Sequence, residues 1–227
     1  SDVDLIYLYP EAGETTGHSP LSNHEYFTRL GQKLSQALSE HTADGYVFRV
    51  DLRLRPYGDS GPLVSNFAML EQYFLTQGRE WERYAWVKGR ALSGDEMGLM
   101  ELVRPFVYRK YLDYGAFASM RELHAQIRRE VTRRELADNI KLGPGGIREI
   151  EFLVQAVQAL CGGRRPGILH RSTLGALSRF KKCGLLPAST EAKLAKAYLF
   201  LRDVEHKLQM VHDLQTHALP DQEEELT

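Results

Sequence analysis

The 227-residue chain has little cysteine, no long apolar run and no excess of charge of one sign. Two cysteines, Cys161 and Cys183, are too few for a disulfide framework or a zinc site, so we expect reduced thiols in a cytoplasmic protein. Twenty-nine basic residues against thirty acidic ones give a net charge of -1, which argues against a generally basic nucleic-acid-binding protein. No apolar run approaches about 18 residues, so we expect no membrane span.

The remaining composition is that of a globular protein, with 43% hydrophobic and 26% charged residues. The chain opens directly in a strand-like pattern, without a signal peptide or an initiator methionine. We therefore interpret it as a segment of something longer.

The sequence predicts an α+β fold, in which a small sheet is followed by a mostly helical bundle. Alternating β-branched and aromatic residues predict strands at 2–9 and 46–54, and a capping box at Ser22 predicts a helix that runs to about Glu40. From Phe67 onward, apolar residues recur at intervals of three and four. This periodicity predicts helices at 67–77, 80–92, 95–107, 116–137, 147–161, 172–183 and 189–213. We expect two domains, 1–115 and 116–227.

Acidic and basic side chains share one face of each predicted strand. Asp2 and Asp4 are two residues apart, so their side chains leave the same face. On the second strand, the alternation places Asp51 among three arginines. These arginines are Arg49, Arg53 and Arg55.

Three carboxylates beside arginines suit a divalent cation together with a phosphate group, and oxygen ligands favour Mg²⁺ or Mn²⁺. A surface ladder of salt bridges explains the same pattern. The residue pattern alone leaves both interpretations open.

The strand motif resembles that of the polymerase-β-type nucleotidyltransferases, which have Ser-Asp-x-Asp on one strand, as at residues 1–4, and a third Asp on a later strand. Longer stretches are more specific. Residues 49–64, 81–85 and 139–152 are similar to the bifunctional glutamine synthetase adenylyltransferase/adenylyl-removing enzymes, and the similarity continues to residues 215–220. The resemblance therefore covers essentially the whole chain.

The resemblance implies the half of those enzymes that removes AMP from glutamine synthetase. Arg49, residues 57–63 and the Trp-Glu-Arg at 81–83 fit the removing half better than the attaching half. The implied reaction is attack of orthophosphate on an adenylylated tyrosine, which gives ADP and unmodified glutamine synthetase.

The resemblance also implies site residues and partners. Asp2, Asp4 and Asp51 would be the catalytic residues that hold Mg²⁺, or Mn²⁺. The resemblance further implies the uridylylated PII signal protein and 2-oxoglutarate as regulators. We expect contacts to nucleotide or phosphate from Ser1, Arg53, Arg55, Lys88 and Lys141, with Arg49, Arg148, Glu149 and Glu151 nearby.

Several of these residues also have a structural interpretation. Lys88 lies on the predicted helix 80–92, which suits either a wall of the nucleotide cleft or an aromatic core with solvated basic tips, and we favour the core. Lys141 and Arg148 flank a glycine-rich turn that opens a helix, a pattern that binds phosphate or simply starts the helix. Glu149 either lies near the cleft or pairs with a buried arginine, and the rule that buried charges are paired favours the second.

Two further functions remain open from the sequence. The same metal site would serve ATP-dependent adenylylation, because a catalyst works in both directions. A docking module for glutamine synthetase or PII would use the helical bundle and would not need the carboxylates. The family also places a glycine-rich turn just before Ser1, and we expect a chain that starts at Ser1 to bind metal poorly.

Overall fold

A computed structural model describes the chain apart from residues 1, 44, 46, 109–113, 135, 137–138, 213–216 and 218–227, and apart from the side chains of residues 2, 114, 116–117 and 211–212. The chain divides into two units. Unit 1 comprises Ser1–Glu82 and Arg90–Phe106, and unit 2 comprises Arg83–Gly89 and Val107–Thr227. The predicted boundary at 115/116 stays a prediction.

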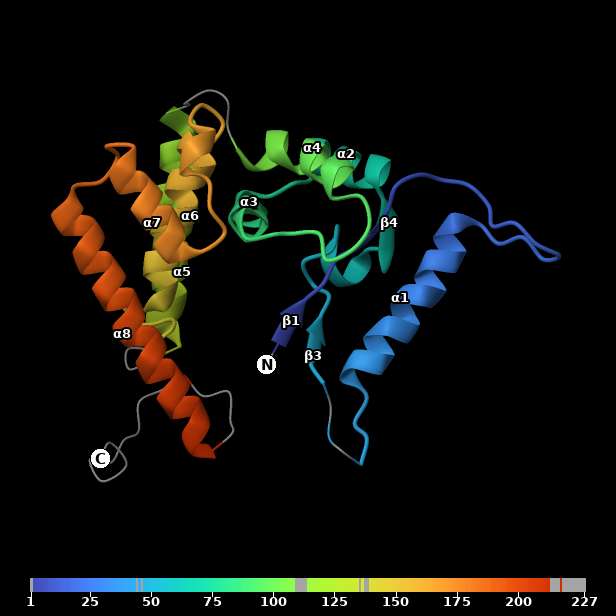
Figure 1. Cartoon of the computed structure of the whole chain (residues 1–227), viewed down its shortest axis with the longest axis horizontal. Coiled ribbons are helices and arrows are strands. Elements are labelled where there is room, and N and C mark those ends of the chain that lie inside the picture. Colours follow the sequence, from blue (N-terminus) through green and yellow to red (C-terminus); the bar gives the residue numbers. More distant parts are fainter. Residues whose placement is uncertain are drawn as a thin grey trace. The chain divides into compact units, whose positions relative to one another are not determined.

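Unit 1 contains two short parallel strand pairs. Strand β1 (Asp2–Asp4) pairs with β3 (Arg49–Asp51), and β2 (Tyr7–Tyr9) pairs with β4 (Val64–Asn66), as Figure 1 shows for the first pair. The single strand predicted at 2–9 is therefore two strands with different partners. Parallel neighbours need a crossover connection, and the long helix α1 supplies it.

Helix α1 (Asn23–Ser39) packs against β2, β3 and β4. It begins as predicted, because the Ser22 side chain accepts a hydrogen bond from the Glu25 backbone N–H. Gly31 is buried against the ring of Tyr7, where an added Cβ would lie 3.0 Å from a ring carbon. The Tyr7 hydroxyl bonds Ser35 Oγ at 2.9 Å, which joins the strand to the helix.

Three more helices complete the first part of the chain: α2 (Phe67–Thr76), α3 (Glu80–Val87) and α4 (Glu96–Val107). Asn66 caps α2 by accepting from the Met69 backbone N–H. Helix α3 is shorter than the predicted 80–92, since Lys88 and Gly89 bond back to Ala85 and Trp86 in a turn that ends it.

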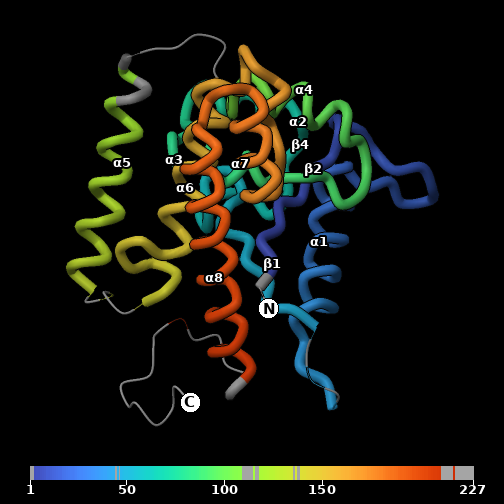
Figure 2. The backbone as a smooth tube through the Cα atoms, turned by 60° about the vertical axis from the view of Figure 1, so that its left-hand side comes forward, coloured from blue at the N-terminus to red at the C-terminus, as the bar shows by residue number. Residues whose placement is uncertain are grey.

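Unit 2 is helical, with α5 (Tyr114–Arg133), α6 (Ile147–Cys161), α7 (Thr173–Lys182) and α8 (Ala188–His212). Helices α6, α7 and α8 pack against one another, and Figure 2 shows α8 running beside α6 and α7. Val154 of α6 shares a buried cluster with residues of the following turn and α7. Its partners there are Ile168, Ala176, Leu177 and Phe180.

The predicted α+β class is confirmed, and α6 has the bounds that the apolar periodicity predicted. Within the described residues, no helix is both long enough and apolar enough to cross a membrane. Cys161 and Cys183 are free thiols, as expected.

Candidate functional site

The pairing of β1 with β3 brings the predicted carboxylates of unit 1 together. Asp2 lies opposite Arg49, and Asp4 lies opposite Asp51. Neighbouring strands are about 4.8 Å apart, and side chains at paired positions of parallel strands leave the same face. Asp4 and Asp51 therefore stand side by side, with the Asp2 position on the same face of β1.

Asp51 is held ionised by its neighbour Arg53. The Asp51 carboxylate accepts hydrogen bonds from Arg53 Nη2 at 2.5 Å, from Nε at 3.0 Å and from the Arg53 backbone N–H at 2.9 Å. The side-chain and backbone hydrogen bonds from Arg53 lower the pKa of Asp51, and Arg49 acts in the same direction. Asp4 contributes to raising the pKa of Arg53, so its charge also acts on this group.

The prediction that Arg53 and Arg55 continue the strand face is wrong. Strand β3 ends at Asp51, because the Asp51 side chain bonds the Arg53 backbone and turns the chain. Arg55 Nη1 donates to the Leu52 carbonyl at 2.8 Å and lies 3.4 Å from Asp59 Oδ1. The Arg53 side chain is 74% exposed and that of Arg55 is 14% exposed, so only Arg53 presents its charge to solvent.

A divalent cation fits the chemistry of this donor set. The paired Asp4 and Asp51 offer carboxylate oxygens alone, the ligands that Mg²⁺ and Mn²⁺ prefer. Among the side chains that the structure describes, no three acidic, histidine or cysteine groups form a metal cluster. The Asp2 side chain and Ser1 lie outside the described residues. A cation at Asp51 would have to share its oxygens with Arg53.

A buried hydrogen-bond relay lies beside the loop after Asp51, and we did not predict it from the sequence. Glu82, at 4% exposure, accepts from the Tyr73 hydroxyl at 2.8 Å and from the Arg79 backbone N–H at 2.7 Å. Burial, followed by the bond to Glu82, raises the pKa of Tyr73 to about 12. The ring of Tyr57 packs edge-on against that of Tyr73, with 4.8 Å between the ring centroids. The Trp-Glu-Arg motif was the only signal, since it contains Glu82.

Lys88 and Glu151 meet each other in unit 2. Lys88 Nζ lies 2.7 Å from Glu151 Oε1, and the Tyr198 hydroxyl donates to the same oxygen at 3.0 Å. Burial raises the pKa of Tyr198, and the Glu151 charge adds to this increase. This contact joins the residues after α3 to α6 and α8, so the Lys88 ammonium is paired within unit 2.

Lys141 belongs to a second set of contacts between residues of unit 2 that are distant in sequence. Its Nζ lies 3.4 Å from His217 Nε2, and the Ile140 backbone N–H donates to the His217 carbonyl at 2.9 Å. His217 Nδ1 lies 3.2 Å from Oε1 of the buried Glu205, and the other oxygen of Glu205 accepts from Arg202 Nη1 at 2.5 Å. The residues before the glycine-rich turn are thus anchored to His217, the one residue of 215–220 that the structure describes.

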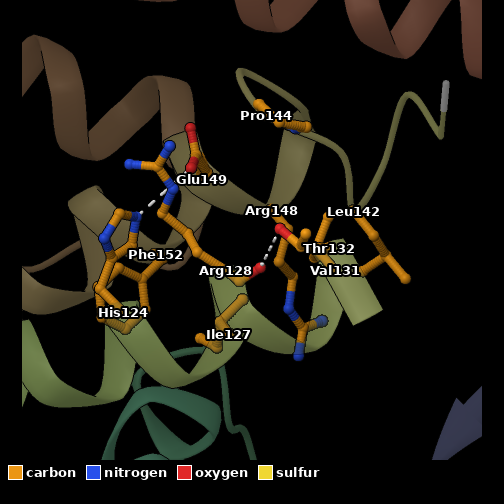
Figure 3. A pocket seen from close by; sticks show the side chains of 10 residues that line it. All are labelled: His124, Ile127, Arg128, Val131, Thr132, Leu142, Pro144, Arg148, Glu149 and Phe152. Carbon is orange, nitrogen blue, oxygen red and sulfur yellow. Dashed lines mark hydrogen bonds and ion pairs between the residues drawn. The ribbon is translucent and has the colours of Figure 1, made fainter. Parts of the chain in front are cut away.

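Arg148 and Glu149 line a pocket of about 60 Å³ between α5 and α6 (Figure 3). Glu149 Oε1 lies 3.4 Å from His124 Nε2, and its other oxygen accepts from the Gly145 backbone N–H at 3.0 Å. The expected buried arginine partner is therefore wrong: a histidine and the helix-capping turn take its place. The side chains of Arg148 and Arg128 extend in opposite directions in Figure 3, so they do not form one anion clamp.

The predicted site residues thus fall into two groups. Asp2, Asp4 and Asp51 lie with Arg49 and Arg53 on unit 1. The residues predicted from the later motifs belong to unit 2. These are Lys88, Lys141, Arg148, Glu149 and Glu151.

Two family models match the chain, one for each part. Residues 1–102 match the glutamate-ammonia ligase adenylyltransferase model, and residues 121–227 match the GlnD PII-uridylyltransferase model.

Similar proteins cover almost all of the chain, and three of them are named bifunctional glutamine synthetase adenylyltransferase/adenylyl-removing enzyme. The protein of Chromobacterium violaceum is 60% identical over 97% of this chain and 25% of its own length. The protein of Nitrosomonas europaea is 58% identical over 100% of this chain and 25% of its own length. The protein of Aromatoleum aromaticum is 58% identical over 99% of this chain and 24% of its own length. The chain spans about a quarter of the length of these relatives, and the family resemblance seen in the sequence is confirmed.

Proposed function

We propose that this chain, a relative of the bifunctional glutamine synthetase adenylyltransferase/adenylyl-removing enzymes, carries the adenylyl-removing reaction. An oxygen of orthophosphate attacks the AMP phosphorus on an adenylylated tyrosine of glutamine synthetase. The bond from phosphorus to the tyrosyl oxygen breaks, and the proton of hydrogen phosphate ends on that oxygen. The products are ADP and unmodified tyrosine.

The observation that carries the proposal is the register of β1 and β3, which places Asp4 beside Asp51. With Asp2, these carboxylates would hold Mg²⁺ or Mn²⁺. Bound divalent ions would neutralise phosphate charge and stabilise the leaving tyrosyl oxygen. Asp51 stays ionised well below neutral pH because Arg53 lowers its pKa, so its oxygens remain available as ligands.

We assign the phosphate contact on this loop to Arg53. Its guanidinium is largely exposed and already lies against Asp51, so it can stabilise negative charge that develops beside the carboxylates. Arg55 is mostly buried and bonds the Leu52 carbonyl, which suits a role in shaping the loop.

The removing direction is supported by sequence details. Arg49 before Val-Asp, residues 57–63 and the Trp-Glu-Arg at 81–83 resemble the removing half. The relatives are named for both activities, so the direction rests on these motifs.

Regulation by the PII protein and by 2-oxoglutarate is part of the proposal. Its support is the match of residues 121–227 to the PII-uridylyltransferase model, together with the resemblance to enzymes regulated in this way. Glutamine synthetase is the proposed protein substrate, and the proposed location is the cytoplasm.

The test is ADP release from adenylylated glutamine synthetase with Mg²⁺ and orthophosphate, in the presence of uridylylated PII and 2-oxoglutarate. A version of the protein that begins upstream of Ser1 should be used, so that a glycine-rich turn precedes β1. We expect ADP that depends on both phosphate and metal. AMP incorporation from ATP without phosphorolysis would assign the attaching reaction instead, and partner binding in EDTA without either reaction would assign a docking module.

A further inference from the structure

The Tyr57 backbone has a conformation that side chains rarely adopt. Among the described residues, Tyr57 is the one residue other than glycine with positive φ, at 63°. The residue is 51% exposed, so burial in the core does not explain the choice of an aromatic residue. Backbone strain of this kind persists where the surroundings enforce it, and it gathers at ligand-binding sites.

The loop around Tyr57 is fixed from two sides. Gly58 has φ of +57°, and a Cβ added at Gly61 would lie 2.0 Å from the Pro56 carbonyl oxygen, so both positions require glycine. The Tyr73 hydroxyl donates to the buried Glu82 at 2.8 Å. This bond fixes Tyr73, and the Tyr57 ring rests edge-on against the Tyr73 ring.

The same loop also passes close to Arg53, the partner of Asp51. A Cβ added at Gly58 would lie 3.7 Å from the Arg53 carbonyl oxygen, so Gly58 lies close to the Arg53 backbone. The Arg53 guanidinium holds Asp51. Tyr57, which is about half exposed, thus directly precedes the glycine that approaches the residue bound to the candidate metal ligand.

We infer that the Tyr57 ring is a stacking surface for the adenine base of the AMP group, a subsite that rests on the proposed nucleotidyl-transfer function. Every base presents a π-face to an aromatic ring, and such stacking is insensitive to base hydrogen bonding. The arrangement separates two tasks: Asp4, Asp51 and Arg53 face the phosphate, and Tyr57 holds the base. A preset loop holds the ring in place before the nucleotide arrives, which lowers the entropic cost of ordering it.

The test uses Tyr57→Asn, with Tyr57→Phe as the matched control, in the version that begins upstream of Ser1. Asparagine tolerates positive φ and removes the ring, whereas phenylalanine keeps the ring. The dissociation constants of AMP and of ribose 5-phosphate, which lacks the base, are measured by calorimetry with Mn²⁺ present. Thermal unfolding of each variant checks that the loop change leaves the protein folded.

We expect Tyr57→Asn to weaken AMP binding about tenfold, the order of effect of removing a stacking ring, and to leave ribose 5-phosphate binding unchanged. Tyr57→Phe should bind both ligands like the wild type. Equal AMP binding by the wild type and Tyr57→Asn, or equal weakening of both ligands, would overturn the stacking role alone. Failure of the folded wild type to bind AMP would instead overturn the proposed function and this subsite with it.

Discussion

The two units of the chain use the same kinds of charged residue in opposite ways. In unit 1, Asp51 and Arg53 pair at a strand end, where the arginine side chain is 74% exposed. In unit 2, the side chain of Glu205 is 4% exposed and pairs with Arg202 and His217. The side chain of Glu151 is 15% exposed and pairs with Lys88, which is distant in sequence. Charges at the strand end remain accessible to a ligand, whereas those among the helices are already occupied by protein partners.

The role of a carboxylate in this chain therefore depends on its partners and on its exposure. Exposed pairs contribute little stability, so the strand-end carboxylates are not explained by folding. Buried pairs become costly when one partner is removed, which suits a structural role. Substitutions of the strand-end charges in unit 1 should therefore affect chemistry, and substitutions of the buried charges in unit 2 should affect stability.

The largest expected effect is on catalysis at Asp51. Asp51→Asn should lower kcat for ADP release by about 10³-fold, because the reaction loses a charge that would hold the metal at the developing transition state. The melting temperature should hardly change, since the Asp51–Arg53 pair is exposed. Glu25→Gln on α1, which removes an exposed acid of the same unit, is the control and should retain full activity. Equal activity of Asp51→Asn and wild type would remove Asp51 from the site.

The second largest expected effect is on the stability of unit 2. Glu205→Gln should lower the free energy of unfolding by about 2 kcal/mol in urea titrations, because Arg202 and His217 lose their buried anionic partner. Arg202 is partly exposed, so the loss should be smaller than for a fully buried pair. Asp203→Asn, on the exposed side of the same helix, should be neutral. A Glu205→Gln protein as stable as Asp203→Asn would show that burial does not distinguish the two sites.

A smaller effect on stability is expected at alkaline pH, through the buried hydrogen bond from Tyr73 to Glu82. The pKa of Tyr73 is raised to about 12 in the folded protein from an ordinary value of 10.0. Between pH 10 and 12 the unfolded state loses this proton while the folded state keeps it, so stability should fall as pH rises. The difference between wild type and Tyr73→Phe in urea titrations at pH 9 and pH 11 measures the effect. A pH-independent difference would contradict the assigned relay.

The smallest effect is expected on the exposed face of α5. Hydrogen bonds from Arg133 and Arg134 lower the pKa of Glu130 to about 2, yet all three side chains are substantially exposed. Solvent screens such pairs, so Glu130→Gln should leave the melting temperature unchanged within error at low and high salt. A clear loss of stability would mean that exposed charges also support unit 2, which would weaken the contrast between the units.

Periodicity in the sequence predicted most of the fold, because it reports local burial. Helix α6 and the Ser22 cap of α1 were predicted correctly, since each depends on neighbours along the chain. The strand at 46–54 was predicted too long, because the Asp51 side chain bends the backbone at Arg53. Alternation alone does not reveal that bond.

The candidate site was predictable in its carboxylates and less so in its surroundings. Spacing put Asp2 and Asp4 on one face, and the strand register added Asp51. The partners of Lys88 and Glu149 depend on helix packing in unit 2, and residue types alone do not specify it. The Glu82 relay had no signal beyond a motif whose hydrogen bonds become visible only in three dimensions.

The most direct test of the contrast is Mn²⁺ binding, measured by electron paramagnetic resonance on the protein that begins upstream of Ser1. Wild type and Glu205→Gln are titrated at a temperature where both are folded, together with Asp4→Asn and Asp51→Asn. We expect equal Mn²⁺ affinity for wild type and Glu205→Gln, and at least about tenfold weaker binding for the two aspartate variants. Unchanged Mn²⁺ affinity in both aspartate variants would contradict the claim that the paired strands form the metal site.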